Sequence, residues 1–237
     1  MTTVIGSGLL AKTFVATAFS RNCLVLASGV SNSNEHRDTE FRREVDIVEA
    51  AMRAHPTSRV IYFSTCSILQ KSQTPYIRHK LEMEARVAAA ASSFHIYRLP
   101  QVVGPTRNLT LVSYFVESLL QRRRVAVQRH AKRNLVDVGD VSRLIHHLVE
   151  HDIGLNSTQS LASAHSVQVA DVLKAIGELL DIEPIFDVIN AGESYDISTD
   201  FLNRYFGSAD PLMKKDYWRA VLQKHVPAIA SKIRSAT

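Results

Sequence analysis

Short apolar segments alternate with helix-length amphipathic segments through the first hundred residues, and this alternation restricts the fold more than any other feature. The segments expected as strands are residues 4–5, 23–27, 59–63 and 95–99. The segments expected as helices are residues 8–20, 39–54 and 75–92, each with apolar side chains at helical spacing. Strands that alternate with helices form parallel sheets covered on both faces. We therefore predict an α/β, Rossmann-like, doubly wound parallel sheet, with ligands at the carboxyl ends of its strands.

The remaining residues indicate a smaller second part. A chain of 237 residues fits one large α/β domain, or one domain with an appended lobe. We predict a Rossmann-like nucleotide-binding domain over residues 1–155 and a small C-terminal substrate-binding lobe over residues 156–237, interleaved with the first. Further helices are expected at residues 111–121, 141–151, 168–180, 199–206 and 216–231, and strands at 125–127 and 184–188. Pro227 is expected to break the last helix.

A glycine-rich turn lies between the first strand and the first helix. Gly6, Gly8 and Ala11 stand in the spacing GxGxxA. In a dinucleotide site the first glycine makes the tight turn, the second lets a pyrophosphate approach the backbone, and the small third residue lets the helix pack closely. An acidic residue that reads the adenosine ribose usually ends the next strand, but here the first acid after that strand is Glu35. Either the adenosine is bound differently, or this is not the usual second strand.

A threonine, a tyrosine and a lysine follow the strand predicted at residues 59–63. Tyr76 and Lys80 are four residues apart, so they project from one face of the predicted helix. An ammonium group near a phenol favours the phenolate, and such a tyrosine can exchange a proton with a sugar hydroxyl. Thr65 can hydrogen-bond the same oxygen. An exposed tyrosine–lysine pair on an ordinary helix is the alternative reading of these two residues.

Several segments, in the right order, resemble the NAD-dependent epimerase/dehydratase family, the extended short-chain dehydrogenases/reductases. Residues 4–11 resemble the glycine turn, 24–31 a later strand of the family, 61–67 the strand with the catalytic hydroxyl, and 75–82 the YxxxK helix. Residues 98–105 and 133–141 are similar to two further sequence motifs of the family. Residues 161–206 are similar to its C-terminal part. The resemblance covers nearly the whole chain.

The resemblance implies roles for individual residues. The implied catalytic residues are Thr65, Tyr76 and Lys80. The implied cofactor contacts are Gly6, Ser7, Gly8, Leu9, Leu10, Ala11, Ala27, Ser28, Gly29, Ser64, Tyr76, Lys80 and Pro100. The implied substrate contacts are Cys66, Ser67, Gln101, Arg107 and Arg133, of which Arg133 suits a diphosphate because guanidinium groups bind such anions through paired hydrogen bonds. The implied cofactor is NAD or NADP, and the implied substrate is a nucleotide-linked sugar.

The chain also departs from the family pattern. If residues 24–31 are the family's later strand, its usual second and third strands are absent and the adenine half of the cofactor site is open or lost. Glu40 and Arg43 stand where the family often has asparagine and glycine. Cys66 and Ser67 stand where 4,6-dehydratases carry an acid–base pair, which elimination of water requires. This leaves 4-epimerisation or keto-reduction in polysaccharide or nucleotide-sugar metabolism, with a degenerate, non-catalytic sugar-nucleotide-binding or assembly protein as the alternative.

Charge and composition restrict the class of partner. The net charge is +5, and Arg122, Arg123 and Arg124 form a basic run that suits a phosphorylated small molecule. No interleaved aromatic residues or nucleic-acid-binding module accompany them, so nucleic acid is not an expected partner. His147 and His151 lack the further ligands that a metal site needs, so no metal is predicted. The sequence shows no signal peptide or membrane span, and we expect a cytoplasmic protein. The family resemblance implies a homodimer through residues 39–54 and 75–92, although packing against the rest of the chain would also explain their apolar faces.

Overall fold

The computed structural model describes residues 1–106 and 110–235, which divide into two compact units. The first unit contains residues 1–99 and 138–161, and the second contains residues 100–137 and 162–237. The chain thus passes between the units three times. The assignment of a nucleotide-binding role to residues 1–155 and a substrate-binding role to residues 156–237 stays a prediction.

A five-stranded parallel sheet forms the centre of the first unit, which confirms the Rossmann-like α/β prediction. Its strands, in spatial order, are β1 (Thr2–Ile5), β2 (Cys23–Leu26), β3 (Arg59–Thr65), β4 (Phe94–Leu99) and β9 (Ser157–Ser160). Ile5 lies opposite Leu26, and Leu26 lies opposite Tyr62. The carboxyl ends of neighbouring strands therefore meet at one edge of the sheet. β1 is an edge strand; the absence of two family strands beside it stays a prediction.

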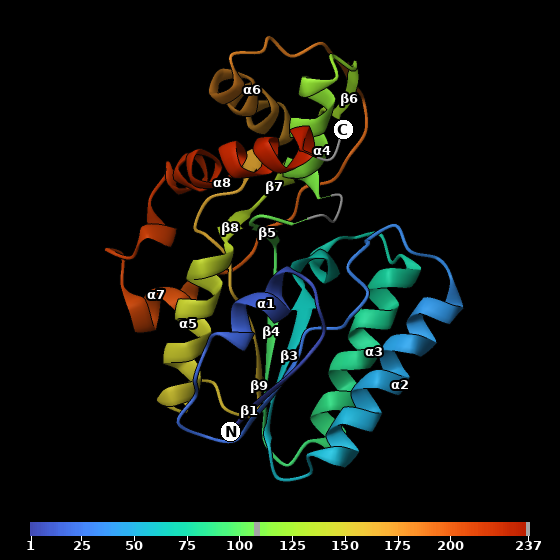
Figure 1. The fold of residues 1–237 in the computed structure, drawn as a ribbon, viewed down its shortest axis with the longest axis vertical. Helices are drawn as coiled ribbons and strands as arrows, with labels where there is room; N and C mark the ends of the chain where they lie inside the picture. The colour runs from blue at the N-terminus through green and yellow to red at the C-terminus, as the bar shows by residue number, and fades with distance from the viewer. Residues whose placement is uncertain (107–109, 236–237) are drawn as a thin grey trace. The chain divides into compact units, whose positions relative to one another are not determined.

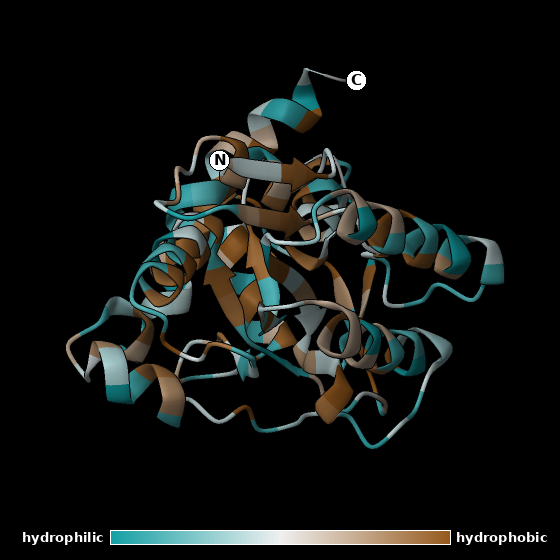
Figure 2. Cartoon of the chain, turned by 90° about the horizontal axis from the view of Figure 1, so that it is seen from below, coloured by the Kyte–Doolittle hydropathy of each residue, from teal (hydrophilic) through white to brown (hydrophobic). Residues whose placement is uncertain are grey.

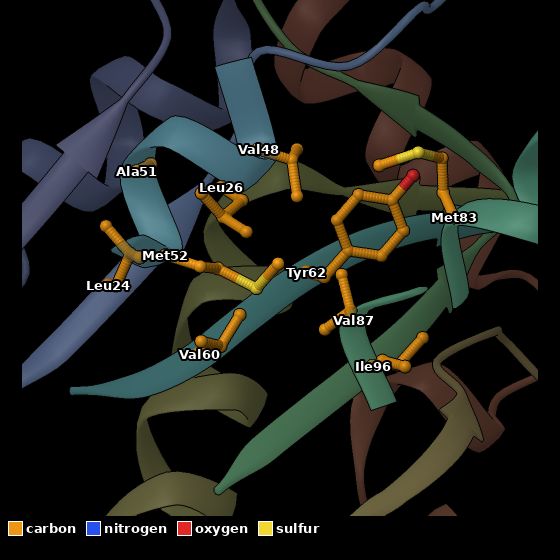
Figure 3. Close-up of a cluster of buried hydrophobic side chains, with 10 residues drawn as sticks. All are labelled: Leu24, Leu26, Val48, Ala51, Met52, Val60, Tyr62, Met83, Val87 and Ile96. Carbon is orange, nitrogen blue, oxygen red and sulfur yellow. The ribbon is translucent and has the colours of Figure 1, made fainter. Parts of the chain in front are cut away.

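Two long helices, α2 (Asp38–Ala54) and α3 (Pro75–Ala90), lie side by side on one face of this sheet (Figure 1). Their apolar faces and the alternate strand residues that point toward them form one buried cluster, in which Val48, Tyr62, Met83 and Ile96 are almost completely buried (Figure 3). Each element contributes side chains at its own periodicity, 3.6 residues in the helices and two in the strands. This packing holds the start of α3 at the carboxyl edge of the sheet.

The opposite face is covered by α1 (Leu9–Val15) and α5 (Val138–Glu150), which contact each other. Phe14 of α1 is fully buried, with its ring centroid 5.4 Å from that of Phe63 on β3. Figure 2 shows much of the hydrophobic colour on the strands and a mixture of hydrophobic and hydrophilic residues on the helices. A short 3-10 helix, η1 (Cys66–Leu69), follows β3 directly. α1 is shorter than the helix predicted for residues 8–20.

The second unit packs three helices together, α4 (Leu111–Leu120), α6 (Val169–Leu180) and α8 (Tyr217–Arg234). Its strands form three two-stranded ladders: β5 (Gln101–Val103) with β8 (Leu135–Asp137), β6 (Val125–Gln128) with β11 (Phe186–Ile189), and β7 (Lys132–Arg133) with β10 (Val167–Gln168). Two short helical segments, α7 (Asp200–Phe206) and η2 (Pro211–Met213), precede α8.

The predicted break of the last helix at Pro227 is wrong. α8 continues through Pro227 to Arg234. Val226, Ile229 and Ala230 are buried on either side of the proline, so tertiary packing holds the helix together where one backbone hydrogen bond is lost. Among the described residues, no helix is both long enough and apolar enough to cross a membrane, and no group of three or more candidate ligands could hold a metal ion.

Candidate functional site

The glycine turn joins β1 to α1. The fold requires glycine at one of its two glycine positions and not at the other. Gly6 has φ +133°, and a Cβ there would lie 2.3 Å from the carbonyl oxygen of Ala27. The fold itself therefore requires glycine at this position. Gly8 has φ −76°, which any residue adopts, and a Cβ there would meet no described atom within 4 Å. Nothing in the chain requires a glycine at position 8, and the open space leaves room for a ligand to approach the backbone.

An unpartnered polar atom lies beside this turn. The hydroxyl of Ser28 is buried and makes no hydrogen bond with any part of the chain that the structure describes. The backbone nitrogen of Ser28 would be 3.0 Å from a Cβ on Gly6, so the loop after β2 and the turn after β1 are in contact. Buried polar groups in proteins nearly always have a partner, which a ligand or water can supply. The open position at Gly8 and the free hydroxyl fit a bound dinucleotide, and the backbone of residues 6–11 would hold its phosphates.

The end of β3 carries the predicted hydroxyl residues. Thr65 Oγ1 accepts a hydrogen bond of 3.0 Å from the backbone nitrogen of Ser67, which caps η1. Ser64 Oγ donates to Glu84 at 2.5 Å. Both hydroxyls are thus fixed by neighbours within the first unit.

Cys66 is completely buried, and its thiol donates to the carbonyl oxygen of Arg98 at 3.3 Å. Burial raises the pKa of Cys66 to about 12, so the thiol stays protonated. Cys66 has no exposed surface in this structure. Its assignment as a substrate contact stays a prediction.

Tyr76 lies in the first turn of α3, which begins cleanly. Thr74 caps the helix by accepting a hydrogen bond from the backbone nitrogen of Ile77, and Pro75 occupies the first helical position. The side chain of Tyr76 is 6% exposed and packs in a small cluster with Val30 and Ile77. Within the described part of the chain, its hydroxyl makes no hydrogen bond.

Lys80 lies one turn further along α3 and is held inside the protein. It is 3% exposed, and its Nζ lies 2.8 Å from Glu44 Oε1 and 3.1 Å from the hydroxyl of Tyr62. Burial disfavours the ammonium, but the charge of Glu44 and the contact with Tyr62 raise the pKa of Lys80 above its usual range. A Cβ on Gly29 would lie 2.7 Å from the lysine nitrogen, so the loop after β2 crosses directly beside it.

Glu44 was not predicted from the sequence as a site residue. Burial alone would raise the pKa of Glu44, yet the Lys80 charge and hydrogen bonds from His79, Lys80 and Tyr62 hold it far below its usual value. A weak sequence indication existed. Glu44 lies three residues after Phe41 and four before Val48, on the apolar stripe of its helix, where a carboxylate needs a buried partner.

The structure brings most of the predicted first-unit residues to one edge of the sheet. The glycine turn touches the loop after β2, and that loop touches the Lys80 side chain. Leu9 and Leu10 begin α1, and Ala11, the next residue of that helix, is buried. Glu40 and Arg43, the two departures noted in α2, form an exposed pair with each other at 3.0 Å.

The other predicted residues belong to the second unit. Pro100 precedes β5, and the backbone nitrogen of Gln101 donates to the carbonyl oxygen of Asn134 at 3.0 Å. Arg133 is half-buried on β7, with Nη1 donating to the carbonyl oxygen of Lys132 at 2.8 Å. Arg107 lies outside the described residues. The roles of these four residues stay predictions.

Comparison with known proteins gives a family and a fold. A model described as the NAD dependent epimerase/dehydratase family matches residues 22–159, beginning after the glycine turn. No curated protein matches the chain in sequence.

Many solved structures share the fold at low identity. RMD from Pseudomonas aeruginosa, complexed with NADPH, is 14% identical with a TM-score of 0.76, over 100% of this chain and 99% of that one. The Bordetella bronchiseptica enzyme WbmH, in complex with NAD+, is 18% identical with a TM-score of 0.68, over 87% and 74% of the two chains. The UDP-glucose 4-epimerase of Thermotoga maritima, with UDP-glucose, is 14% identical with a TM-score of 0.69, over 90% and 78%.

Proposed function

The chain belongs to the NAD dependent epimerase/dehydratase family, and on that premise we propose that it is a nicotinamide-dependent enzyme that epimerises at C4, or reduces a ketone, on a nucleotide-linked sugar. The observation that carries the proposal is the glycine turn. No described atom of the chain requires residue 8 to be a glycine, and the buried Ser28 hydroxyl beside the turn has no hydrogen-bond partner among the described residues. The Thermotoga relative was solved with UDP-glucose, and the other two with NADPH and NAD+. We extend those ligand classes to this chain.

The proposed roles follow from the chemistry of the side chains. Residues 6–11 and 27–29 hold the cofactor, and the cofactor supplies hydride transfer when bound. Tyr76 gives a proton to, or takes one from, the reacting sugar oxygen. Thr65 donates a hydrogen bond from its hydroxyl to that oxygen, since Oγ1 uses only an acceptor lone pair in its hydrogen bond with the backbone nitrogen of Ser67. Arg107, Arg133 and Gln101 bind the nucleotide diphosphate, with Cys66 and Ser67 near the sugar.

Dehydration is not part of the proposal. Dehydration needs two protein side chains, an acid and a base, that act on neighbouring carbons of the sugar. At the positions where 4,6-dehydratases carry that pair, this chain has Cys66 and Ser67. The Cys66 thiol, with its raised pKa, is a poor base as well as fully buried. The two remaining reactions both use one proton-exchanging group and one cofactor.

Tyr76→Phe tests the assignment. Removal of one hydroxyl from a buried ring keeps the packing with Val30 and Ile77 and removes the proton donor, so turnover should fall by about 100-fold to 10,000-fold. The assay follows nicotinamide absorbance and sugar products with a panel of uridine-, thymidine- and guanosine-diphosphate sugars. Tyr205→Phe, a half-exposed tyrosine of α7, serves as the matched control. Turnover by Tyr76→Phe at the unaltered rate would rule out the role of Tyr76.

A second candidate function is a non-catalytic protein that binds a sugar nucleotide or assembles with others. The specific observation in its favour is that Lys80 is 3% exposed and already bound to Glu44. Isothermal titration with NAD(H) and NADP(H) separates the two candidates. Micromolar binding of either cofactor supports the enzyme, whereas binding of neither cofactor supports the second candidate.

Oligomeric state and location enter the proposal only as predictions. We expect a homodimer through α2 and α3 from the family resemblance, and a cytoplasmic location from the sequence of the chain. Light scattering of the purified protein at two concentrations checks the first, and fractionation of cells that express the tagged chain checks the second.

A further inference from the structure

The loop after β2, here residues 27–30, is held from two sides within the first unit. On one side, the carbonyl oxygen of Ala27 and the backbone nitrogen of Ser28 lie directly against Gly6 of the glycine turn. On the other side, the loop meets the side chain of Glu44, which comes from α2. The position of the loop therefore depends on Glu44 as well as on the turn.

Glu44 holds the loop through its backbone. Oε2 of Glu44 accepts a hydrogen bond of 2.7 Å from the backbone nitrogen of Val30, and Glu44 is completely buried. A Cβ on Gly29 would lie 2.7 Å from both Glu44 Oε1 and Lys80 Nζ, so the chain runs directly beside the ion pair. A hydrogen bond from a backbone amide to a carboxylate is stronger than one between neutral groups. Glu44 therefore fixes the two residues that follow Ser28.

Three side chains hold the Glu44 carboxylate in place. Oε1 accepts from the Tyr62 hydroxyl at 2.7 Å and from Lys80 Nζ at 2.8 Å, and Oε2 lies 2.9 Å from Nε2 of His79. Burial alone would raise the pKa of Glu44, but these contacts hold it far below its usual value. The carboxylate is thus a fixed, ionised acceptor for the loop, and Lys80 is its counter-ion.

The loop that Glu44 holds carries two groups of the candidate site. The buried hydroxyl of Ser28 has no hydrogen-bond partner in the part of the chain that the structure describes. The side chain of Val30 packs with Tyr76. Hydrogen bonds weaken steeply with distance and angle, so a hydroxyl on a loop held in one position binds a ligand more tightly than one that must be ordered on binding.

We propose that Glu44, with Lys80 as its counter-ion, is a positioning residue for cofactor binding: it fixes the loop after β2 so that the Ser28 hydroxyl donates to an oxygen of the bound dinucleotide. This inference rests on the proposed function and adds to it a residue that the family resemblance does not imply. Glu44 itself makes no contact with the cofactor, and Lys80 acts through Glu44.

Two double variants separate this role from the charge of the pair. Glu44→Leu with Lys80→Met, the apolar variant, replaces the pair by side chains of similar size and removes the acceptor of Val30. Glu44→Gln with Lys80→Met, the amide variant, is equally uncharged. Its amide oxygen can still accept from Val30 while its amide nitrogen donates to the Tyr62 hydroxyl. Replacement of a buried ion pair by apolar side chains often leaves stability unaltered, so both proteins should fold.

Amide hydrogen exchange, followed by NMR without cofactor, reports the loop itself. The Val30 amide should exchange at least about tenfold faster in the apolar variant than in the wild type, because its acceptor is gone. In the amide variant it should exchange close to the wild-type rate. Equal exchange rates in the wild type and the apolar variant would overturn the proposal.

Calorimetric titration with NADH and NADPH reports the consequence for binding. The apolar variant should bind the cofactor about tenfold more weakly than the wild type, the size expected for one hydrogen bond, and the amide variant should stay within about threefold. In a Ser28→Ala background the apolar substitutions should have little further effect, because Glu44 acts through the Ser28 hydroxyl. Glu49→Gln, which alters a partly exposed carboxylate of α2 paired with Arg86, is the matched control and should bind as the wild type does.

No loss of affinity in the folded apolar variant, or an equal loss in both Ser28 backgrounds, also overturns the proposal. If circular dichroism shows that the apolar variant does not fold, Gly29→Ala replaces it, since its Cβ would displace the loop from the ion pair. The same tenfold loss is expected there, and unaltered affinity contradicts the role of Glu44. A wild type that binds neither cofactor contradicts the proposed function and this inference with it, whereas a wild type and an apolar variant that bind equally contradict only the role of Glu44.

Discussion

His95 makes the stability of the first unit depend on pH. It lies on β4, is completely buried, and has its ring centroid 5.7 Å from that of Tyr97. Burial and then the charge of Arg59 lower the pKa of His95 from its ordinary value of 6.5 to about 4. At pH values below about 6.5, the pKa of His95 in the unfolded chain, the unfolded chain binds a proton at His95 that the folded protein does not. Stability is therefore fully present above about pH 6.5 and is lost as pH falls toward 4.

The size of the effect follows from the two pKa values. A difference of about 2.5 pH units corresponds to about 3 kcal/mol of unfolding free energy when the loss is complete. At pH 5 the expected loss is about 2 kcal/mol. Because folded proteins are stable by only about 5–15 kcal/mol, urea unfolding followed by circular dichroism resolves this loss easily.

His95→Gln is the perturbation, because glutamine is polar and similar in size but does not titrate. Carboxylates also lose stability in acid, and they do so equally in both proteins, so the difference between the two curves isolates His95. The wild type should lose about 2 kcal/mol more than His95→Gln between pH 7 and pH 5. Parallel curves for the two proteins over this range would refute the reasoning.

Two further predictions concern the glycine turn and the buried ion pair. Gly6→Ala should lower the unfolding free energy by at least about 2 kcal/mol, because φ +133° and the nearby carbonyl exclude a Cβ, while Gly8→Ala stays within about 1 kcal/mol of the wild type; equal losses in urea unfolding would contradict this. Lys80→Met should cost about 3–5 kcal/mol by leaving Glu44 buried without its counter-ion. The double variant Lys80→Met with Glu44→Gln should recover most of that loss, and additive losses would show that the pair is not coupled.

The sequence predicts elements whose apolar residues recur at a clear period. The helices at 38–54 and 75–90 agree with their predicted ranges to within two residues, because their apolar stripes and flanking prolines mark the ends. β9 was missed, since Ser157–Ser160 has no apolar residue and pairs only because β4 offers it a free edge. Pairing between distant segments depends on tertiary structure that local periodicity does not report.

The candidate site divides in the same way. The spacing of Tyr76 and Lys80 on one helix face is a local property and is readable from the sequence. The partner of Lys80 is not, because it depends on α2 lying against α3 with Glu44 turned inward. An acidic residue on the apolar stripe indicates that it has some buried partner, but not which one. The sequence likewise does not show that the fold requires a glycine at position 6 and not at position 8, because that depends on the position of the loop after β2.

The central claim is that the glycine turn holds a nicotinamide dinucleotide, and Gly8→Val tests it most directly. The φ of −76° at position 8 suits any residue, and a Cβ there would meet no described atom within 4 Å, so a valine would extend toward the space that the phosphates need. Calorimetric titration with NADH and NADPH should show binding to the wild type and at least tenfold weaker binding to Gly8→Val, at an unaltered melting temperature. Equal affinity of the two proteins for the cofactor, or no binding to the wild type, would contradict the account.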